Sequence, residues 1–310
     1  MNLPRSYERA ADQKWPRISI VTPSYNQEQF LEETICSVLD QGYPNLEYII
    51  IDGGSTDKSS EIIRKYAAHL AYHCSEPDRG HYDAVNKGFA RSTGEIMAFL
   101  NSDDKYFPGA LRIVAESFLC FPEISWIASL LPAMWDLHGN CIDIARSPGY
   151  SREAFLDDCY GGKGPLRFGP IQQESTFWRR SLWEAIAGRI RSDISHAADF
   201  DLWCRFYAHA DLYGLVAPLG GFRIRAGQRG EGGRSDLYTR QRLDALSEAR
   251  EKLLWKPSFF REFSIRCRLF DLPKIKLLAR KFLGYPAKRI VRLSAGSREE
   301  SWAIQQYRFP

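Results

Sequence analysis

The sequence predicts an α/β fold in which a mostly parallel central sheet is flanked by helices. In the first hundred residues, short apolar runs rich in β-branched residues alternate with segments whose apolar residues recur every three to four positions. Strands that alternate with helices are typical of a parallel sheet covered on both faces. The chain has 310 residues, of which 44% are hydrophobic and 26% charged, so it can bury a substantial core.

Four apolar runs give the expected strands, at residues 18–22, 46–52, 71–75 and 96–100. Helices are expected between them, at the segments that contain Leu31, Ile35 and Val38, Ile62 and Ile63, and residues 82–90. Polar turns follow these strands, with the sequences TPSYN, DGGSTD, SEPDRG and NSDD. Because ligands of parallel α/β sheets bind beyond the carboxyl ends of the strands, we expect the four turns to form one site.

The composition suggests three regions. An N-terminal extension, residues 1–16, precedes a main domain over residues 17–255, in which residues 17–107 alternate between strands and helices and residues 108–255 are less regular. Two glycine-rich segments of this second half, GGKGP at 161–165 and AGQRGEGGRSD at 226–236, are expected to be mobile loops. Residues 256–310 are expected to form a basic amphipathic helical tail.

The positive charge of the chain is concentrated in this tail. From Lys256 to Arg292 there are eleven Lys and Arg against Glu262 and Asp271, a net +9, whereas the whole chain carries +4. Cationic and apolar residues interleave there at helical spacing, which is typical of helices that lie on an anionic membrane surface. A helical pair packed on the catalytic domain remains an alternative, and the apolar content argues against nucleic acid as the partner.

Composition also indicates the compartment. The seven cysteines are odd in number and scattered, as in reduced cytosolic proteins. The longest charge-free apolar stretch, residues 124–135, is shorter than a membrane span, and the N-terminus lacks the apolar core of a signal peptide. We therefore expect a cytoplasmic chain that can lie peripherally on the inner face of the cell membrane.

Two adjacent acids, Asp103 and Asp104, come shortly after the apolar run at 96–100. Carboxylates at a strand end suit Mg²⁺ or Mn²⁺ bound together with a substrate phosphate. The alternative is a simple turn in which Asp103 caps the next segment. Neither GxxxxGK[ST] nor GxGxxG occurs in the first strand-helix turn. The main sequence signatures of P-loop nucleotidases and of dinucleotide dehydrogenases are therefore missing there. A nucleoside diphosphate donor held by acids and a metal ion remains open.

Residues 18–59 and 75–104, which carry these turns, resemble family 2 glycosyltransferases of the bacterial surface-polysaccharide type, with the Rossmann-like GT-A fold. The resemblance extends over about residues 17–224, and it implies that residues 17–255 are a catalytic domain with a nucleotide-binding half (17–107) and an acceptor half (108–255). It implies transfer of a sugar, with inversion, from a nucleoside-diphosphate sugar to a glycan or lipid-linked acceptor. UDP is the nucleotide expected from its frequency in the family.

The resemblance also implies roles for individual residues. In the metal motif, Asp103 takes the place of the principal acid, Asn101 replaces the first acid, and Asp104 assists. Nucleotide or donor contacts are expected from Thr22, Pro23, Tyr25, Asn26, Asp52, Asp78, Arg79, Asn86, Asn101, Ser102, Gln173 and Glu174, with Ser175 as a further sugar or acceptor contact. A polar turn before a helix is the alternative for the last three. Arg223 and Arg225 are expected at the diphosphate, with the glycine-rich loop after them as a lid.

A second acidic motif lies in ADFDLWCRF, residues 198–206. It is similar to the acidic motif of the family, with Ala198 replacing the first acid, Asp199 at the catalytic base and Asp201 as its substitute. Inverting transfer needs such a base, because the attacking hydroxyl has a high pKa and must lose its proton. The alternative is that both acids merely favour the helix N-terminus.

Two other functions share this scaffold. A non-catalytic nucleotide-sugar-binding protein is suggested by Asn101 and Ala198, and the retained Asp103 and Asp199 argue against it. A sugar nucleotidyltransferase would need a glycine-rich basic signature near the first strand, which TPSYNQ does not provide.

Overall fold

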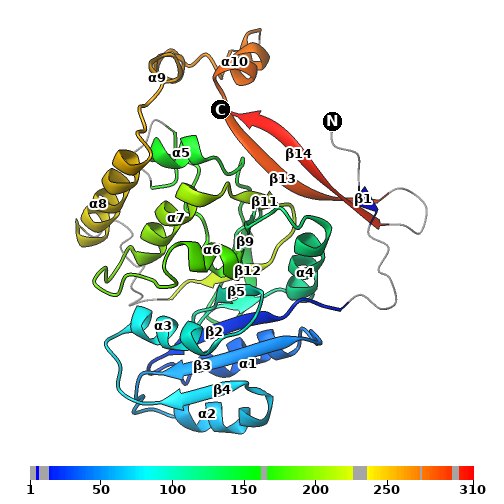
Figure 1. Ribbon diagram of the computed structural model, residues 1–310, viewed down its shortest axis with the longest axis vertical. Coiled ribbons are helices and arrows are strands. Elements are labelled where there is room, and N and C mark those ends of the chain that lie inside the picture. The colour runs from blue at the N-terminus through cyan, green and yellow to red at the C-terminus, as the bar shows by residue number, and fades with distance from the viewer. Residues whose placement is uncertain (1–4, 7–13, 162–165, 226–235, 273, 295–299) are drawn as a thin grey trace.

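The computed structural model describes residues 5–6, 14–161, 166–225, 236–272, 274–294 and 300–310 (Figure 1). Within them, a ten-stranded sheet of order β1-β14-β13-β11-β7-β10-β5-β2-β3-β4 is joined by a four-stranded sheet of order β6-β12-β8-β9. The large sheet runs through the molecule with helices on both faces, and five of its nine strand pairings are parallel. The predicted α/β class is confirmed.

The first half of the large sheet is entirely parallel, as predicted. Its strands are β2 (Ile18–Ser24), β3 (Leu46–Asp52), β4 (Tyr72–Ser75) and β5 (Ile96–Phe99). The helices between them are α1 (Leu31–Leu39), α2 (Ser59–Lys65) and α3 (His81–Arg91), with a short 3₁₀ turn at Ala67–His69. The period of the apolar residues was therefore sufficient to locate these elements.

Alternation along the strands divides the core into two layers. Val21 and Phe99 face one side of the sheet, whereas Ile20 and Ala98 face the other. Helices α3, α5, α6, α7 and α8 cover the first side, and α1, α2 and α4 cover the second. Both faces are thus apolar, so polar groups gather at the ends of the strands.

The second half of the sheet is mixed. It contains β7 (Trp126–Ser129), β10 (Thr176–Arg179) and β11 (Tyr213–Leu215). Its helices are α4 (Ala110–Cys120), α5 (Arg152–Leu156), α6 (Arg180–Ala185), α7 (Ala198–His209) and α8 (Asp236–Lys252). Because β10 is antiparallel to both β5 and β7, strands β7 and β11 run in the direction of β5. The carboxyl ends of β2, β3, β5, β7 and β11 therefore share one edge.

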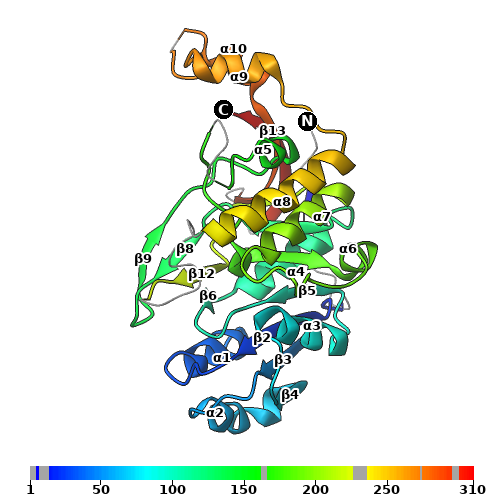
Figure 2. The same ribbon diagram turned by 90° about the vertical axis from the view of Figure 1, so that its left-hand side faces the viewer.

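The small sheet lies at that edge (Figure 2). It consists of β6 (Lys105–Tyr106), β8 (Ala133–Trp135), β9 (Cys141–Ile144) and β12 (Gly220–Arg223). Strand β12 pairs with β6, which begins directly after Asp104. This pairing brings the arginine-containing end of β12 to the turn that carries Asp103 and Asp104.

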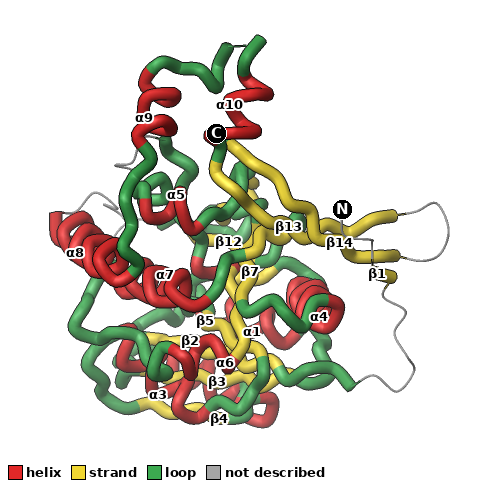
Figure 3. The backbone as a smooth tube through the Cα atoms, turned by 45° about the horizontal axis from the view of Figure 1, so that its top comes forward, coloured by secondary structure: helices red, strands yellow, loops and turns green. Residues whose placement is uncertain are grey.

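The predicted helical tail is wrong beyond residue 284. Two helices, α9 (Phe259–Arg266) and α10 (Lys276–Leu283), do form. They are followed by a long hairpin of β13 (Tyr285–Ser294) and β14 (Glu300–Phe309), which runs away from them (Figure 3). Strand β13 pairs in parallel with β11, and β14 pairs with β1 (Arg5–Ser6), the described strand of the N-terminal extension. The hairpin therefore belongs to the central sheet.

Helices α9 and α10 project from one end of the molecule (Figures 1 and 2). They leave large apolar side chains in solvent, including Phe259, Phe260, Leu277 and Phe282, each between 67% and 78% exposed. Across the described parts of the chain, no helix combines the length and the apolar character that spanning a membrane requires.

We predict that Trp302→Ala in β14 destabilises the protein by about 3–5 kcal/mol, because Trp302 is 2% exposed and packs in the core that includes Ile290. The matched change Phe263→Ala in α9, where the ring is 53% exposed, should alter stability by about 0.5 kcal/mol or less. Urea unfolding followed by tryptophan fluorescence and circular dichroism measures both. Equal stability of Trp302→Ala and wild type would contradict an integral hairpin.

Candidate functional site

The turn after β5 presents one acid to solvent and buries the other. Asp103 keeps its carboxylate near the surface, where Oδ2 lies 2.8 Å from Arg225 Nε. Asp104 is fully buried, and its Oδ1 accepts the backbone N–H of Arg223 at 2.8 Å while its Oδ2 accepts the Asn101 amide at 2.9 Å. Burial, with the negative charges of Glu174 and Asp103, raises the Asp104 pKa well above its usual value. This geometry argues against the expectation that Asp104 is a metal ligand.

A third acid, Glu174, meets this turn from the 3₁₀ segment Gln173–Ser175. Its Oε1 accepts the Asn101 amide at 3.3 Å, and its carboxylate also accepts a hydrogen bond from Asp104. Burial, together with the negative charges of Asp199 and Asp103, raises the Glu174 pKa to about 7. Glu174 is therefore close enough to interact with acids from both predicted motifs.

Asp199 and Asp201 lie in the first turn of α7, but only one faces this cluster. Burial raises the Asp199 pKa to about 6, and its Oδ1 accepts the backbone N–H of Phe200 at 2.8 Å. The Asp201 carboxylate instead pairs with Arg205 at 2.9 Å and Arg191 at 3.5 Å. Asp201 thus anchors its own helix to neighbouring segments, which argues against its expected role as substitute base.

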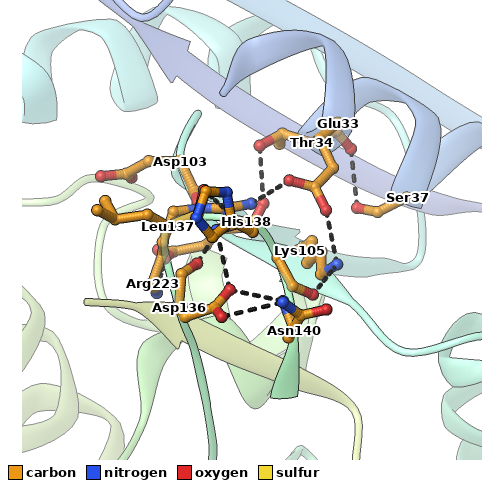
Figure 4. A network of polar contacts seen from close by, with 12 residues as sticks. Glu33, Thr34, Ser37, Asp103, Lys105, Asp136, Leu137, His138, Asn140 and Arg223 are labelled. Carbon is orange, nitrogen blue, oxygen red and sulfur yellow. Dashed lines mark hydrogen bonds and ion pairs between the residues drawn. The ribbon is translucent and has the colours of Figure 1, made fainter. Parts of the chain in front are cut away.

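Arg223 is the centre of a buried polar network (Figure 4). Its side chain is 0% exposed and forms an ion pair with Glu33 of α1 at 2.5 Å. Its Nε donates to the carbonyl of Asp103 at 2.6 Å, and its Nη1 donates to the carbonyls of Asp136 and Leu137. Because these contacts use the guanidinium, Arg223 stabilises the acidic turn from the protein interior. This argues against the expectation that Arg223 contacts the diphosphate.

The network includes residues that the sequence did not reveal. Lys105 Nζ lies 2.6 Å from Glu33 Oε1 and donates to the Gly139 carbonyl at the same distance. Glu33 is on the polar face of α1, where an acid normally meets only solvent, so no local pattern marks it. The sequence also did not reveal Tyr238 of α8. Burial raises the pKa of Tyr238, and the negative charge of Asp199 adds to this rise.

The turns after β2, β3 and β4 bind to one another. Asp52 accepts hydrogen bonds from the backbone N–H of Ser55 at 2.9 Å and the hydroxyl of Ser75 at 2.6 Å. At Gly54 the backbone has φ +81°, and an added Cβ would lie 3.1 Å from the backbone N of Pro77, so glycine is favoured where these two turns meet. Asn26, at φ 52°, accepts the Thr56 N–H through its side chain. The predicted nucleotide-binding turns are thus assembled into one surface.

The other predicted contacts differ in exposure and partners. Tyr25 is 60% exposed, and Arg79, also exposed, pairs with Asp83 at 2.8 Å. Thr22, Pro23, Ser102 and Gln173 are buried, the first of them against the Tyr48 hydroxyl and the last against the Phe99 carbonyl. Asn86 exchanges two hydrogen bonds with the backbone of Ile190, so it joins the two halves of the domain, which argues against a donor contact. The predicted lid, residues 226–236, lies outside the described residues except for Asp236.

The donor atoms at this edge fit a hard divalent cation. Among the residues with described positions, no three His, Cys, Asp or Glu side chains gather to hold a metal ion by themselves. Asn101 Oδ1, however, is buried and has no hydrogen-bond partner in the described chain, and Asn101 lies two residues before Asp103 in the same turn. One amide and one carboxylate oxygen are suitable ligands for Mg²⁺ or Mn²⁺ that also binds a ligand phosphate and water.

Comparison with known proteins identifies relatives of this site-bearing region. Residues 19–121 match the sequence profile described as Glycosyl transferase family 2. The Putative teichuronic acid biosynthesis glycosyltransferase TuaG of Bacillus subtilis is 42% identical over 96 residues, which cover 29% of this chain and 37% of TuaG. The Uncharacterized glycosyltransferase RP339 of Rickettsia prowazekii is 33% identical over 214 residues, which cover 69% of this chain and 65% of the relative.

Structural similarity extends further than sequence similarity. The crystal structure of S. aureus TarS 1-349 in complex with UDP-GlcNAc aligns with a TM-score of 0.58 and 17% identity, covering 86% of this chain and 76% of TarS 1-349. At this identity the likeness shows the fold alone. The chain spans about a third of the length of several of the curated relatives it matches, including TuaG.

Proposed function

Because the chain carries a glycosyl transferase family 2 domain within a GT-A fold, we propose that it is an inverting glycosyltransferase of surface-polysaccharide or glycolipid assembly. The donor is a nucleoside-diphosphate sugar, and UDP is the expected nucleotide. The acceptor is a glycan or a lipid-linked saccharide. The name of TuaG, a relative over the first half of the catalytic domain, supports this class of pathway.

One observation carries the proposal. Asp103, Glu174 and Asp199 come from three elements far apart in sequence, yet their charges interact at the carboxyl edge of the sheet. The raised pKa values of Glu174 and Asp199 at such an edge are typical of a functional site rather than of a structural turn. The two motifs singled out from the sequence therefore belong to one site.

In the proposed reaction, Asp199 is the general base. Its carboxylate accepts the proton of an acceptor hydroxyl while the hydroxyl oxygen attacks the anomeric carbon. The bond from that carbon to the diphosphate breaks on the opposite side, and the nucleoside diphosphate leaves with the electron pair. A pKa of about 6 keeps Asp199 mostly ionised at neutral pH while retaining affinity for the proton.

Asp103 and Asn101 are the residues proposed to hold Mn²⁺ or Mg²⁺. When bound, such an ion would neutralise charge on the donor diphosphate. Arg225, whose guanidinium lies 2.8 Å from Asp103 and stacks 5.5 Å from the Phe30 ring, is positioned to contact the same diphosphate. Arg223 holds the turn in place through the Asp103 carbonyl.

The exposed faces of α9 and α10 are proposed to lie on a membrane. Their apolar side chains alternate with exposed cations, among them Arg266, Lys276 and Lys281. Apolar insertion and attraction to anionic headgroups act together in such helices. Attachment of this kind, on the inner face of the cell membrane, would suit a lipid-linked acceptor.

We predict that one nucleoside diphosphate binds at least tenfold more tightly with Mn²⁺ than without it, and that Asp103→Ala removes this gain because the ion loses its carboxylate. Isothermal titration with UDP, GDP, CDP, dTDP and their sugar derivatives measures the effect and identifies the base. Asp143→Ala, at an exposed acid of β9, is the matched control and should bind as wild type does. Metal-independent binding that is unchanged in Asp103→Ala would refute the metal site.

We predict that donor turnover rises about tenfold between pH 5 and pH 7 and then levels off, because Asp199 acts as a base only when deprotonated and its pKa is about 6. Release of nucleoside diphosphate from the donor provides the assay. Asp199→Asn should lose about 10²–10⁴-fold in rate. Asp201→Asn should keep the rising profile, since its carboxylate binds Arg205. A wild-type rate in Asp199→Asn would exclude this residue as the base.

We predict that the protein sediments with phosphatidylglycerol vesicles and much less with phosphatidylcholine vesicles. Replacing Phe260, Leu277 and Phe282 together by serine should weaken sedimentation at least tenfold, because it removes the apolar surface that inserts. Ile142→Ser, at a side chain 55% exposed on β9, is the control and should sediment as wild type does. Equal sedimentation of the triple variant would contradict membrane docking by α9 and α10.

A further inference from the structure

A cavity of about 190 Å³ lies at the carboxyl ends of β7 and β11, apart from the acids of the candidate site. Leu130, Leu131 and Val216 form its apolar part, and Arg146, Arg289 and Tyr307 form its polar part. No carboxylate lines it among the described residues. At roughly 30 Å³ per water molecule, its volume is that of about six waters, enough for a phosphate group or for a carboxylate with part of its sugar.

The two arginines of the cavity have no acidic partner. Arg289 is partly buried and Arg146 is exposed, and neither lies within 4.0 Å of a described carboxylate. Arg289 is nevertheless held in place, because its Nε donates to Gln305 Oε1 at 2.9 Å and its guanidinium lies 4.9 Å from the Tyr307 ring. Its terminal nitrogens have no acceptor among the residues described here.

Tyr307 lines the cavity together with Arg146 and Arg289, and its hydroxyl is affected by the charge of both arginines. Its hydroxyl donates to the carbonyl of Pro148 at 2.9 Å and is partly buried. Burial raises the Tyr307 pKa to about 12, whereas the positive charges of Arg289 and Arg146 oppose that rise. The two guanidiniums therefore converge on one apolar-walled space, which is the arrangement that recognises an anion through charge and several N–H donors.

The cavity belongs to the same edge of the sheet as the acids. Strands β7 and β11 run in the direction of β5, so their carboxyl ends point the same way. Leu131 leads into β8, whose first carbonyl, that of Ala133, accepts a hydrogen bond from Gln172 at 2.8 Å. Gln172 directly precedes the segment that carries Glu174. The cavity thus lies in the acceptor half, connected to the acidic cluster through one short segment.

We infer that this cavity binds an anionic group of the acceptor glycan, either a sugar carboxylate or a phosphate. The inference rests on the proposed function, because it assigns the acceptor to this half of the site. It adds a chemical class: an acidic saccharide is preferred over a neutral one. The two arginines hold the acceptor by its charge and leave Asp199 to the reacting hydroxyl.

The test is isothermal titration of wild type and of the double variant Arg146→Gln/Arg289→Gln with trigalacturonic acid, glycerol 3-phosphate and neutral maltotriose. Wild type should bind one of the two anions and bind maltotriose at least tenfold more weakly. The double variant should bind that anion at least tenfold more weakly than wild type. Arg64→Gln/Arg189→Gln, at exposed arginines that do not line the cavity, removes the same charge elsewhere and should bind as wild type does.

Preference for trigalacturonic acid would identify a carboxylate site, and preference for glycerol 3-phosphate a phosphate site. Absence of binding to both anions, equal binding of maltotriose, or wild-type affinity in the double variant would overturn the inference. The single variant Arg146→Gln, at an exposed side chain, tests the same point if the double variant does not fold. Titration of UDP with Mn²⁺ on the same samples reports on the donor site separately, so failure of either site is read independently.

Discussion

The buried guanidinium of Arg223 is the interaction on which the geometry of the site depends. Removing a cation from water costs several kcal/mol unless its donors are satisfied, and here Glu33 and three backbone carbonyls satisfy them. These partners come from α1, from the turn after β5 and from the β8–β9 turn. A Cβ added at Gly220 of the same strand would lie 2.3 Å from the Glu174 carbonyl. One strand therefore fixes the acidic turn and the Glu174 segment relative to each other.

That fixed geometry brings together acids that would otherwise repel one another. Burial disfavours a charged carboxylate, and a neighbouring negative charge disfavours it further. The chain limits this cost in three ways: Arg225 pairs with Asp103, Asp104 donates a hydrogen bond to Glu174, and the backbone N–H of Arg223 donates to Asp104. The remaining negative potential at the surface favours a divalent cation and, through it, a diphosphate. In the proposed function, the unfavourable electrostatic energy of the cluster is thus the physical basis of donor binding.

The sequence was sufficient where the local period determines the structure. Strands β2 to β5 and the helices between them follow from apolar spacing, and the polar turns locate the edge. The segment YPAKRIVRLS fits either a helix or a strand by period, and its pairing with β11 decides for the strand. Likewise, no local pattern tells whether Asp201 or Arg223 pairs inside the protein or meets a ligand. Those choices depend on partners such as Arg205 and Glu33, which lie on other turns or elements.

The hairpin that the sequence concealed also joins the two proposed acceptor features. One residue, Gly284, separates α10 from β13, and Arg289 is the fifth residue of β13. At about 3.3 Å per residue, Arg289 lies roughly 13 Å along the strand from its first residue, Tyr285. An acceptor held near a membrane by α9 and α10 would therefore reach the arginine cavity with its first charged sugar. In the proposed arrangement, acids at the β5 end would bind the donor diphosphate through a divalent cation, whereas arginines at the β7 and β11 ends would bind an acidic acceptor directly.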